Sequence, residues 1–318
     1  MKRLILLVLM TAFAVAGLAA QPKYEVSVTT FRFADRDGQQ LMLDRYTSPS
    51  TEGMRPCMIF VFGGGFAGGE RNWETYIPYY DFLAGNGIDV VAIDYRLGLK
   101  DVDPAAVGDI KAMIGIMKRA VDMAVEDLYS ATLFVLDHAA EWQIDTRRIM
   151  ISGSSAGAIT VLQAENGICN SSAAASVLPA DFRYAGVVSC AGAIFSTSGK
   201  PHWDKAPAPM LLFHGDADSN VPYKKASLMG VGYYGSQIIA RQLDKLSSPY
   251  YFYSARCVDH SLAVTPLEDQ LDLILQFINE YVFSERRLRI TADVESLGGS
   301  RCKTHFSIKD YLRTNYAE

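Results

Sequence analysis

Apolar residues along this chain gather in short continuous runs, with longer mixed segments between them. The runs, which are rich in Val, Ile and Phe, predict buried strands at 57–63, 88–95, 148–153, 185–190, 209–214 and 250–254. The intervening segments predict helices at 76–84, 120–142, 156–163, 235–246 and 267–283, and an edge hairpin at 24–33 and 41–46. Because strands alternate with helices, we expect an α/β fold whose mostly parallel sheet is covered on both faces.

Two segments interrupt this alternation. The first, 98–118, follows the carboxyl end of a predicted strand and mixes charged residues with an apolar run at 113–117. Ligand crevices of open α/β sheets lie at that end of the strands. We therefore expect 98–118 to form a cap or an acyl pocket, with a purely structural loop as the alternative. The second, 286–318, carries no catalytic motif, and we expect a packed or partly mobile appendage to a domain spanning 21–285.

Residues 153–157 are Gly-Ser-Ser-Ala-Gly and lie between a predicted strand and a predicted helix. In that context, a G-x-S-x-G pattern is typical of a sharp turn that presents its central serine as a nucleophile. Glycines flank such a turn because larger side chains would collide with the neighbouring backbone. The pattern indicates Ser155 as the nucleophile; the alternative is a tight turn in which Ser155 only caps the helix.

A serine nucleophile needs a base and an acid that orients the base. Downstream, the loop after the predicted strand 209–214 carries Asp216 and Asp218, and His260 follows the predicted strand 250–254. The carboxyl ends of successive parallel strands meet at one edge of a sheet. We therefore expect Ser155, His260 and an aspartate to converge there.

Linked motifs between about residues 40 and 283 resemble those of the α/β-hydrolase family, in its esterase and lipase branch with a glycine-rich oxyanion loop. They are Phe-Gly-Gly-Gly-Phe at 62–66, Asp-Tyr-Arg at 94–96, Ile-Asp-Thr-Arg-Arg-Ile at 144–149 and His-Gly-x-x-Asp-x-x-Val-Pro at 214–222. The resemblance implies an α/β-hydrolase three-layer sandwich in which Ser155 is the nucleophile, Asp218 the acid and His260 the base.

The same resemblance implies an oxyanion hole. The backbone N–H groups of Gly64, Gly65 and Ala156 would bind the oxygen that becomes negative in the transition state. Glycine suits the loop because its backbone must approach the substrate closely. Phe62 stands where the family often has histidine, which leaves open how the loop is braced.

The function that this resemblance implies is a secreted serine hydrolase that cleaves carboxylic esters through an acyl-enzyme, without a cofactor. The chain resembles esterases of this branch that remove acetyl or feruloyl groups from plant polysaccharides. The mixed polarity of 98–118 also favours such short-chain or aromatic acyl esters over long-chain ones. A peptidase or a non-catalytic binding protein on the same fold are the alternatives. Aromatic residues that would line a pocket or else pack in the core are Phe66, Trp73, Tyr76, Tyr223 and Tyr234.

Composition and charge narrow the class of protein. The 318 residues are 49% hydrophobic, enough for a large core, and the net charge of −5 without a basic stripe argues against nucleic-acid binding. The first 20 residues combine Met-Lys-Arg, an apolar stretch and small residues before Gln21, which is typical of a secretory signal peptide. We expect export to the periplasm or the extracellular space, without stable membrane insertion.

The five cysteines are odd in number and irregular in spacing, so they predict no particular pairing. Cys57, Cys190 and Cys257 lie in or beside predicted strands, where cysteine acts as a small core residue. Neither C-x-x-C nor H-x-x-x-H spacing occurs, and we therefore expect no metal site.

Overall fold

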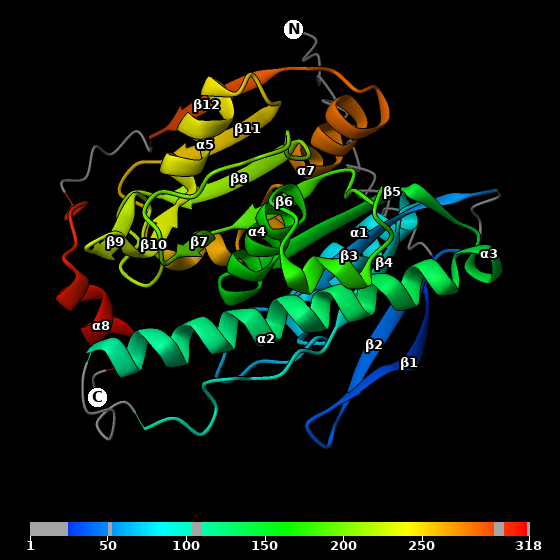
Figure 1. The fold of residues 1–318 in the computed structure, drawn as a ribbon. Helices are drawn as coiled ribbons and strands as arrows, with labels where there is room; N and C mark the ends of the chain where they lie inside the picture. The colour runs from blue at the N-terminus through cyan, green and yellow to red at the C-terminus, as the bar shows by residue number, and fades with distance from the viewer. Residues whose placement is uncertain (1–24, 50–52, 104–109, 296–301, 317–318) are drawn as a thin grey trace, which may run out of the picture.

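The computed structural model describes residues 25–49, 53–103, 110–295 and 302–316. A nine-stranded central sheet has the order β1-β2-β4-β3-β5-β6-β8-β11-β12 (Figure 1). β2 pairs antiparallel with both of its neighbours, β1 and β4, whereas the strands from β4 to β12 pair with one another in parallel. The strands are β1 (Ser27–Arg36), β2 (Gln39–Thr47), β3 (Arg55–Val61), β4 (Asp89–Ile93), β5 (Ile144–Ser154), β6 (Val187–Cys190), β8 (Met210–Gly215), β11 (Tyr250–Ala255) and β12 (Arg289–Val294).

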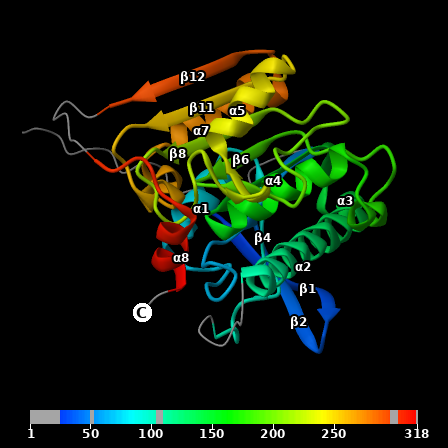
Figure 2. The same ribbon diagram turned by 60° about the vertical axis from the view of Figure 1, so that its left-hand side comes forward.

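Helices cover both faces of this sheet, as predicted. On one face α2 packs against α4, and α5 lies over β8 and β11; on the other, α1 packs against α6 and α7 (Figure 2). The α-helices of these two layers are α1 (Ile77–Gly85), α2 (Ile110–Asp137), α3 (Ala139–Trp142), α4 (Ala156–Cys169), α5 (Ser236–Lys245), α6 (Pro266–Asp269) and α7 (Leu271–Phe277). Short 3-10 or π turns are η1 (Glu74–Tyr76), η3 (Ala173–Val177), η4 (His260–Ala263) and η5 (Ile278–Phe283).

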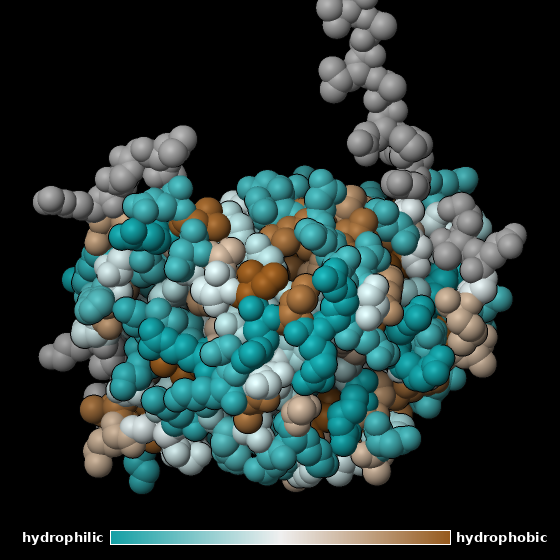
Figure 3. All heavy atoms as spheres, turned by 90° about the horizontal axis from the view of Figure 1, so that it is seen from above, coloured by the Kyte–Doolittle hydropathy of each residue, from teal (hydrophilic) through white to brown (hydrophobic). Residues whose placement is uncertain are grey.

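The core strands owe their continuous apolar character to burial on both faces. Every residue of β4, β6 and β8 is buried, which is the pattern expected of parallel strands between two helical layers. The outer strands differ, because β1 and β12 are largely exposed. The face over β12, α5 and α7 is mostly hydrophilic, with apolar side chains gathered near its middle (Figure 3), which suits the edge of a sheet.

A second sheet was not predicted. It has three antiparallel strands in the order β7-β10-β9, namely β7 (Ala193–Ser196), β10 (Val231–Gly235) and β9 (Lys225–Leu228). These strands have four or five residues each, so they give too short an apolar pattern to distinguish them from loops. The small sheet lies beside the carboxyl ends of β6 and β8.

The predicted central strands are confirmed, but three helices differ from their predictions. The helix expected at 156–163 continues to Cys169. The helix expected at 120–142 begins at Ile110, ends at Asp137 and is followed by the separate turn α3. The helix expected at 267–283 is divided into α6, α7 and η5. None of the described helices, α2 included, is long and apolar enough to cross a membrane.

The segment after residue 285 is part of the fold. β12 pairs in parallel with β11 from Arg289 opposite Tyr250 to Val294 opposite Ala255, and a further helix, α8 (Ile308–Tyr316), lies at the end of the described chain. The boundary that we expected at residue 285 therefore does not coincide with the end of the central sheet. The predicted signal peptide at 1–20 lies outside the described residues.

Candidate active site

The turn at Ser155 joins β5 directly to α4. Ser155 has a left-handed φ of 51° and a ψ of −112°, a combination that an L-residue adopts only when its surroundings require it. A Cβ atom on Gly157 would lie 1.9 Å from the carbonyl oxygen of Val61, and one on Gly153 would lie 2.4 Å from the backbone of Gly157. Glycine is therefore required on both sides of the serine, as the motif predicted.

The Ser155 hydroxyl does not cap α4, which contradicts the structural alternative. It makes no hydrogen bond to the first turn of that helix. Instead, Ser155 Oγ lies 2.8 Å from His260 Nε2, and His260 Nδ1 lies 2.7 Å from Asp218 Oδ2. The three side chains come from the β5–α4 corner, the loop after β8 and the turn η4 after β11, and the structure joins them in one hydrogen-bonded chain.

Asp218 is fully buried and surrounded by donors. Its Oδ1 accepts the backbone N–H groups of Asn220 at 2.8 Å and Val221 at 2.9 Å, while its Oδ2 faces His260 and, at 3.3 Å, His214 Nε2. Burial would raise the pKa of Asp218, but the hydrogen bonds from His214 and His260 outweigh it and hold that pKa below its usual range. An ionised Asp218 can only accept hydrogen bonds, so His260 carries its proton on Nδ1 and leaves Nε2 free to accept from Ser155.

His214 is an additional member of this network. It is fully buried, and its Nε2 lies between Asp218 and the carbonyl oxygen of Val221, 3.2 Å away, so that nitrogen must donate. Its Nδ1 lies 2.8 Å from Ser236 Oγ, at the start of α5. This histidine is the first residue of the motif at 214–222, which had suggested a supporting place for it beside the triad, and the structure shows that it contacts Asp218.

Asp216 has a different place in the structure. Its Oδ1 accepts the backbone N–H of Cys257 at 2.6 Å, which ties the loop after β8 to the turn that precedes His260. The carboxylate that contacts His260 is that of Asp218. The motif spacing had selected Asp218 as the acid, and the geometry favours the same residue.

The glycine loop lies against the serine turn. Gly64, Gly65, Ser155 and Ala156 all line one cavity. Gly64 and Gly65 have positive φ angles of 125° and 64°, and a Cβ atom on Gly64 would lie 2.1 Å from the carbonyl oxygen of Gly68. Ala156 is the first residue of α4, where backbone N–H groups have no partner within the helix. The predicted oxyanion residues are thus gathered around Ser155.

Two tyrosines brace the glycine loop in place of the histidine that Phe62 replaces. Tyr95 donates its hydroxyl to the carbonyl oxygen of Phe62 at 3.1 Å, and the two rings pack 4.5 Å apart. The N–H of Gly63 donates to the Tyr76 hydroxyl at 3.2 Å. Burial raises the pKa of Tyr76 and Tyr95, so both hydroxyls stay protonated. These contacts answer how the loop is held.

The cavity in front of Ser155 has a volume of about 440 Å³ and is mostly apolar. That size is within the range of small-molecule sites, about 300–1,000 Å³. Apart from the glycine loop and the serine turn, its walls include α2, the segment before it at 99–102, the small sheet, the acid loop and α8. Residues that line it from these elements include Met113, Ile114, Met117, Phe195, Val221, Pro222, Ala226, Val231, Tyr233, Tyr311 and Asn315.

Four of the five aromatic residues expected in a pocket do not line this cavity. Phe66 does, whereas Trp73 lies outside it and packs edge-on against Tyr76, 5.3 Å away. Tyr76 is buried beneath the glycine loop, Tyr223 is buried with its hydroxyl 2.7 Å from Ser254 Oγ, and Tyr234 is buried with its hydroxyl bonded to the backbone of Gly230. Core packing was the alternative, and it applies to the three tyrosines.

The described part of 98–118 does line the cavity, through Leu99, Lys100 and Val102 and through the first turns of α2. Residues 104–109 lie outside the described chain. Met113, Ile114 and Met117 are spaced as one face of a helix. This spacing indicates that the helix begins before residue 120, where we predicted its start.

The cysteines divide into two groups. Cys257 forms a disulfide with Cys302, so the expectation that Cys257 is a core residue is wrong. Cys57, Cys169 and Cys190 are buried free thiols, and burial raises the pKa of each. Among the described residues, the cluster with spacing suited to a metal is Asp216, Cys257 and Cys302, but its two sulfurs are bonded to each other.

Solved structures of other proteins are similar to this fold. The apo form of Thermogutta terrifontis esterase 2 is similar at a TM-score of 0.59, with 22% identity over 83% of this chain and 97% of that one. The propionate-bound form of the same thermophilic esterase gives a TM-score of 0.56 over 82% of this chain and 96% of that one, at 22% identity. This likeness establishes the α/β-hydrolase fold, as the motifs had indicated.

Sequence comparison finds similarity to one family model and to proteins named esterases. Residues 43–123 match the BD-FAE family model. Esterase B1 of Culex pipiens is 32% identical over 114 residues, and fumonisin B1 esterase of Sphingopyxis macrogoltabida is 32% identical over 109 residues. Those segments cover 36% and 34% of this chain, and 19% of the length of either relative. The BD-FAE match lies in the segment that includes the glycine loop at 62–66.

Proposed function

We propose that this protein is a serine carboxylesterase. The observation that carries the proposal is the hydrogen-bonded chain from Ser155 Oγ through the His260 ring to Asp218, at 2.8 and 2.7 Å, beside a cavity that Ser155 lines. Such a chain is the arrangement that activates a serine for acyl transfer. The matches to proteins named esterases support the same reaction class.

The first half of the reaction acylates the serine. His260 Nε2 takes the proton of the Ser155 hydroxyl as Oγ bonds to the ester carbonyl carbon, and the carbonyl π electrons move onto its oxygen. When the carbonyl re-forms, the bond to the alcohol oxygen breaks, and the alcohol leaves with the proton from Nε2. Asp218, kept ionised by its donors, stabilises the imidazolium that forms between these steps.

The second half hydrolyses the acyl-enzyme. A water molecule gives its proton to His260 Nε2 and bonds to the acyl carbon, after which the carboxylic acid departs and Ser155 Oγ recovers the proton. In both halves the N–H groups of Gly64, Gly65 and Ala156 hold the oxyanion. The start of α4 adds the positive end of a helix dipole at the same point.

The substrates that we propose are short-chain or aromatic acyl esters, including acetyl or feruloyl groups on carbohydrate. The match to the BD-FAE model supports this acyl class, because BD-FAE denotes a family of bifunctional feruloyl and acetyl xylan esterases. So does the cavity, because its volume of about 440 Å³ and apolar walls suit a small acyl group or one aromatic ring.

The proposal is tested with purified protein and Ser155→Ala on p-nitrophenyl esters from C2 to C16 and on an esterified xylan. We expect Ser155-dependent turnover that is fastest on short or aromatic acyl groups, with release of acetate or ferulate from the polysaccharide. Turnover that survives Ser155→Ala would contradict the mechanism. Preference for C12 or longer, without release from xylan, would contradict only the substrate class.

We further propose that the protein is exported to the periplasm or the extracellular space. The leader-like pattern of residues 1–20 and the Cys257–Cys302 disulfide both support this, since disulfides persist in oxidising compartments. Sequencing the amino terminus of the protein from its native host tests it: a start at Gln21 is expected, and an intact Met1 in a cytosolic fraction would contradict it.

A further inference from the structure

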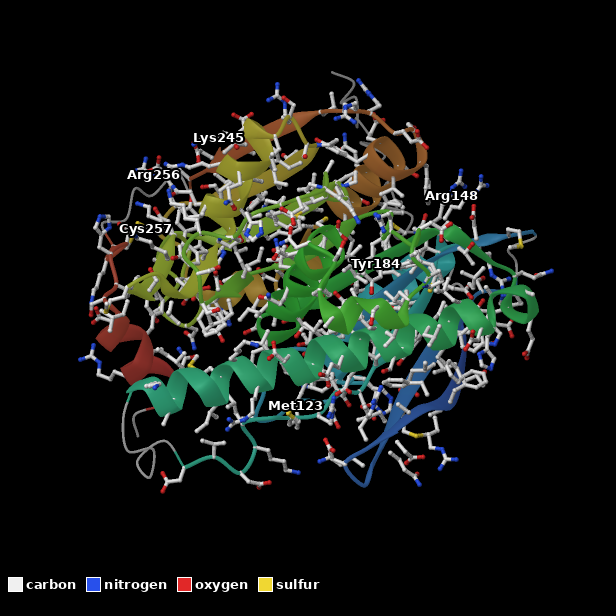
Figure 4. The ribbon with its side chains drawn as sticks, viewed as in Figure 1. Met123, Arg148, Tyr184, Lys245, Arg256 and Cys257 are labelled. Carbon is white, nitrogen blue, oxygen red and sulfur yellow. A yellow bond between two sulfur atoms is a disulfide. The ribbon has the colours of Figure 1, made fainter. Side chains whose placement is uncertain are left out.

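The C-terminal segment returns from the edge of the central sheet to the active site. β12 extends the sheet beyond β11, and Cys302 is then joined to Cys257, three residues before His260. Figure 4 shows Cys257 and Arg256 on the side of the molecule where the chain descends towards α8. The disulfide therefore ties the start of residues 302–316 to the turn that carries the catalytic histidine.

Helix α8 then lies over the loop that carries Asp218. The Tyr311 hydroxyl lies 3.4 Å from the backbone carbonyl oxygen of Asp218, and Asn315 Nδ2 donates to the carbonyl oxygen of Asn220 at 3.0 Å. The helix also packs against β9 of the small sheet. In Figures 1 and 2 it lies next to the amino-terminal end of α2, the helix that supplies the opposite apolar wall.

Tyr311 and Asn315 line the same cavity as Ser155. The Tyr311 ring is part-buried, and burial together with the negative charges of Asp218 and Asp310 raises the pKa of its hydroxyl. The hydroxyl is therefore a neutral donor at any working pH. A bulky neutral ring at this position occupies space that the substrate would otherwise take.

We propose that Tyr311 sets the size of the ester that the cavity accepts, and that the Cys257–Cys302 disulfide holds α8 in the position where it does so. The proposal rests on the esterase function proposed above and names a specificity residue for it. Because α8 contacts the acid loop through backbone carbonyls, the ring of Tyr311 is free to change without removing a partner of Asp218's carboxylate.

Asn315 gives this wall one polar point. Its Nδ2 donates to the carbonyl oxygens of Asn220 and Tyr311, and among the contacts of the described residues its Oδ1 accepts no hydrogen bond. An acceptor at the rim of an apolar cavity fits a substrate with a hydroxyl group beyond its ester. We therefore expect Asn315→Leu to lower kcat/KM for a hydroxylated ester relative to its deoxy analogue.

Kinetics on Tyr311→Ala, Tyr311→Phe and Thr314→Ala test the proposal. Two series are used: p-nitrophenyl esters of increasing acyl length, and acetates of alcohols of increasing size. We expect Tyr311→Ala to raise the ratio of long to short kcat/KM about tenfold in one series, since a methylene or two of pocket space is worth that much. Tyr311→Phe, which keeps the ring, and Thr314→Ala, an exposed neighbour on α8, keep the wild-type ratio.

If Tyr311→Ala changes kcat/KM by the same factor for every ester, the proposal is overturned. Ser155-dependent turnover by the wild type would in that case leave the esterase function intact. If the wild type cleaves no ester, the esterase function fails, and hydrogen exchange decides the placement of α8. Cys302→Ser must then exchange faster at 218–222 and 308–316 than the wild type and Thr314→Ala. Equal protection in all three proteins would overturn the role of the disulfide.

Discussion

The turn that presents Ser155 and the wall that encloses the cavity beside it are built in opposite ways. The turn is five consecutive residues, and backbone crowding requires glycine at its first and last positions, Gly153 and Gly157. The wall is assembled from residues as distant as Met113 and Tyr311, and each has only to be of suitable size. Local steric requirements leave a motif in the sequence, whereas a shared surface does not.

The acid loop gives the largest expected effect on the catalytic side of this comparison. Asp218→Asn removes the carboxylate that fixes the His260 tautomer, so kcat should fall by about 10⁴-fold, as for related triads. Asp216→Asn is the matched control, because Asp216 bonds the backbone of Cys257 and not His260. Steady-state kinetics on both variants separate the two roles, and equal losses would contradict the assignment.

The glycine loop offers a second matched pair. A Cβ atom on Gly64 would meet the backbone of Gly68 at 2.1 Å, whereas one on Gly65 would meet nothing within 4 Å. Gly64→Ala should therefore displace the loop and lower kcat by roughly 10²–10³, the cost of losing an oxyanion donor. Gly65→Ala should cost less, because it adds only left-handed strain. The reverse order in kcat would show that the loop does not act through this backbone.

The wall should respond through specificity and leave the catalytic step in place. Ile114→Phe adds bulk to the α2 side of the cavity, so kcat/KM for the largest accepted esters should fall about tenfold, with little change for acetate. Progress curves on a series of p-nitrophenyl esters measure this. An equal loss on every ester, acetate included, would mean that the substitution disturbs the serine turn.

The sequence predicted the parts of the molecule that local rules determine. The buried parallel strands, the nucleophile corner and the spacing from His214 to Pro222 follow from apolar runs and from backbone geometry. The resemblance to α/β-hydrolases then distinguished Asp218 from Asp216. The structure adds the physical reason, which is that Asp218 receives two backbone N–H groups and two histidines while Asp216 is occupied at Cys257.

The parts that were missed depend on contacts between distant segments. The irregular spacing of the five cysteines does not predict the pairing of Cys257 with Cys302. The strand β12 could not be predicted from its own residues, because it forms by pairing with β11. Tyr76, Tyr223 and Tyr234 were expected in a pocket but have hydroxyl partners in the core. Aromatic residues suit either place, so their type alone does not choose.

The smallest expected effect concerns stability in acid. The pKa of Asp218 is lowered in the folded protein, so its contribution to stability is present above the unfolded value of about 3.9 and is lost as the pH falls through the folded value. Asp218→Asn should therefore lower Tm by a constant few degrees from pH 5 to 7, and the difference should shrink below about pH 4. Thermal unfolding across that pH range measures it, and a gap that widens in acid would contradict the lowered pKa.

The most direct test of the central claim is covalent labelling of the nucleophile. The protein is treated with a p-nitrophenyl alkylphosphonate, and its intact mass and tryptic peptides are measured beside those of Ser155→Ala and Ser154→Ala. The geometry of Ser155 with His260 and Asp218 predicts a single phosphonyl adduct on Ser155 in the wild type and in Ser154→Ala, with loss of esterase activity in step with labelling. An adduct on another residue, or inactivation of Ser155→Ala at the wild-type rate, would contradict it.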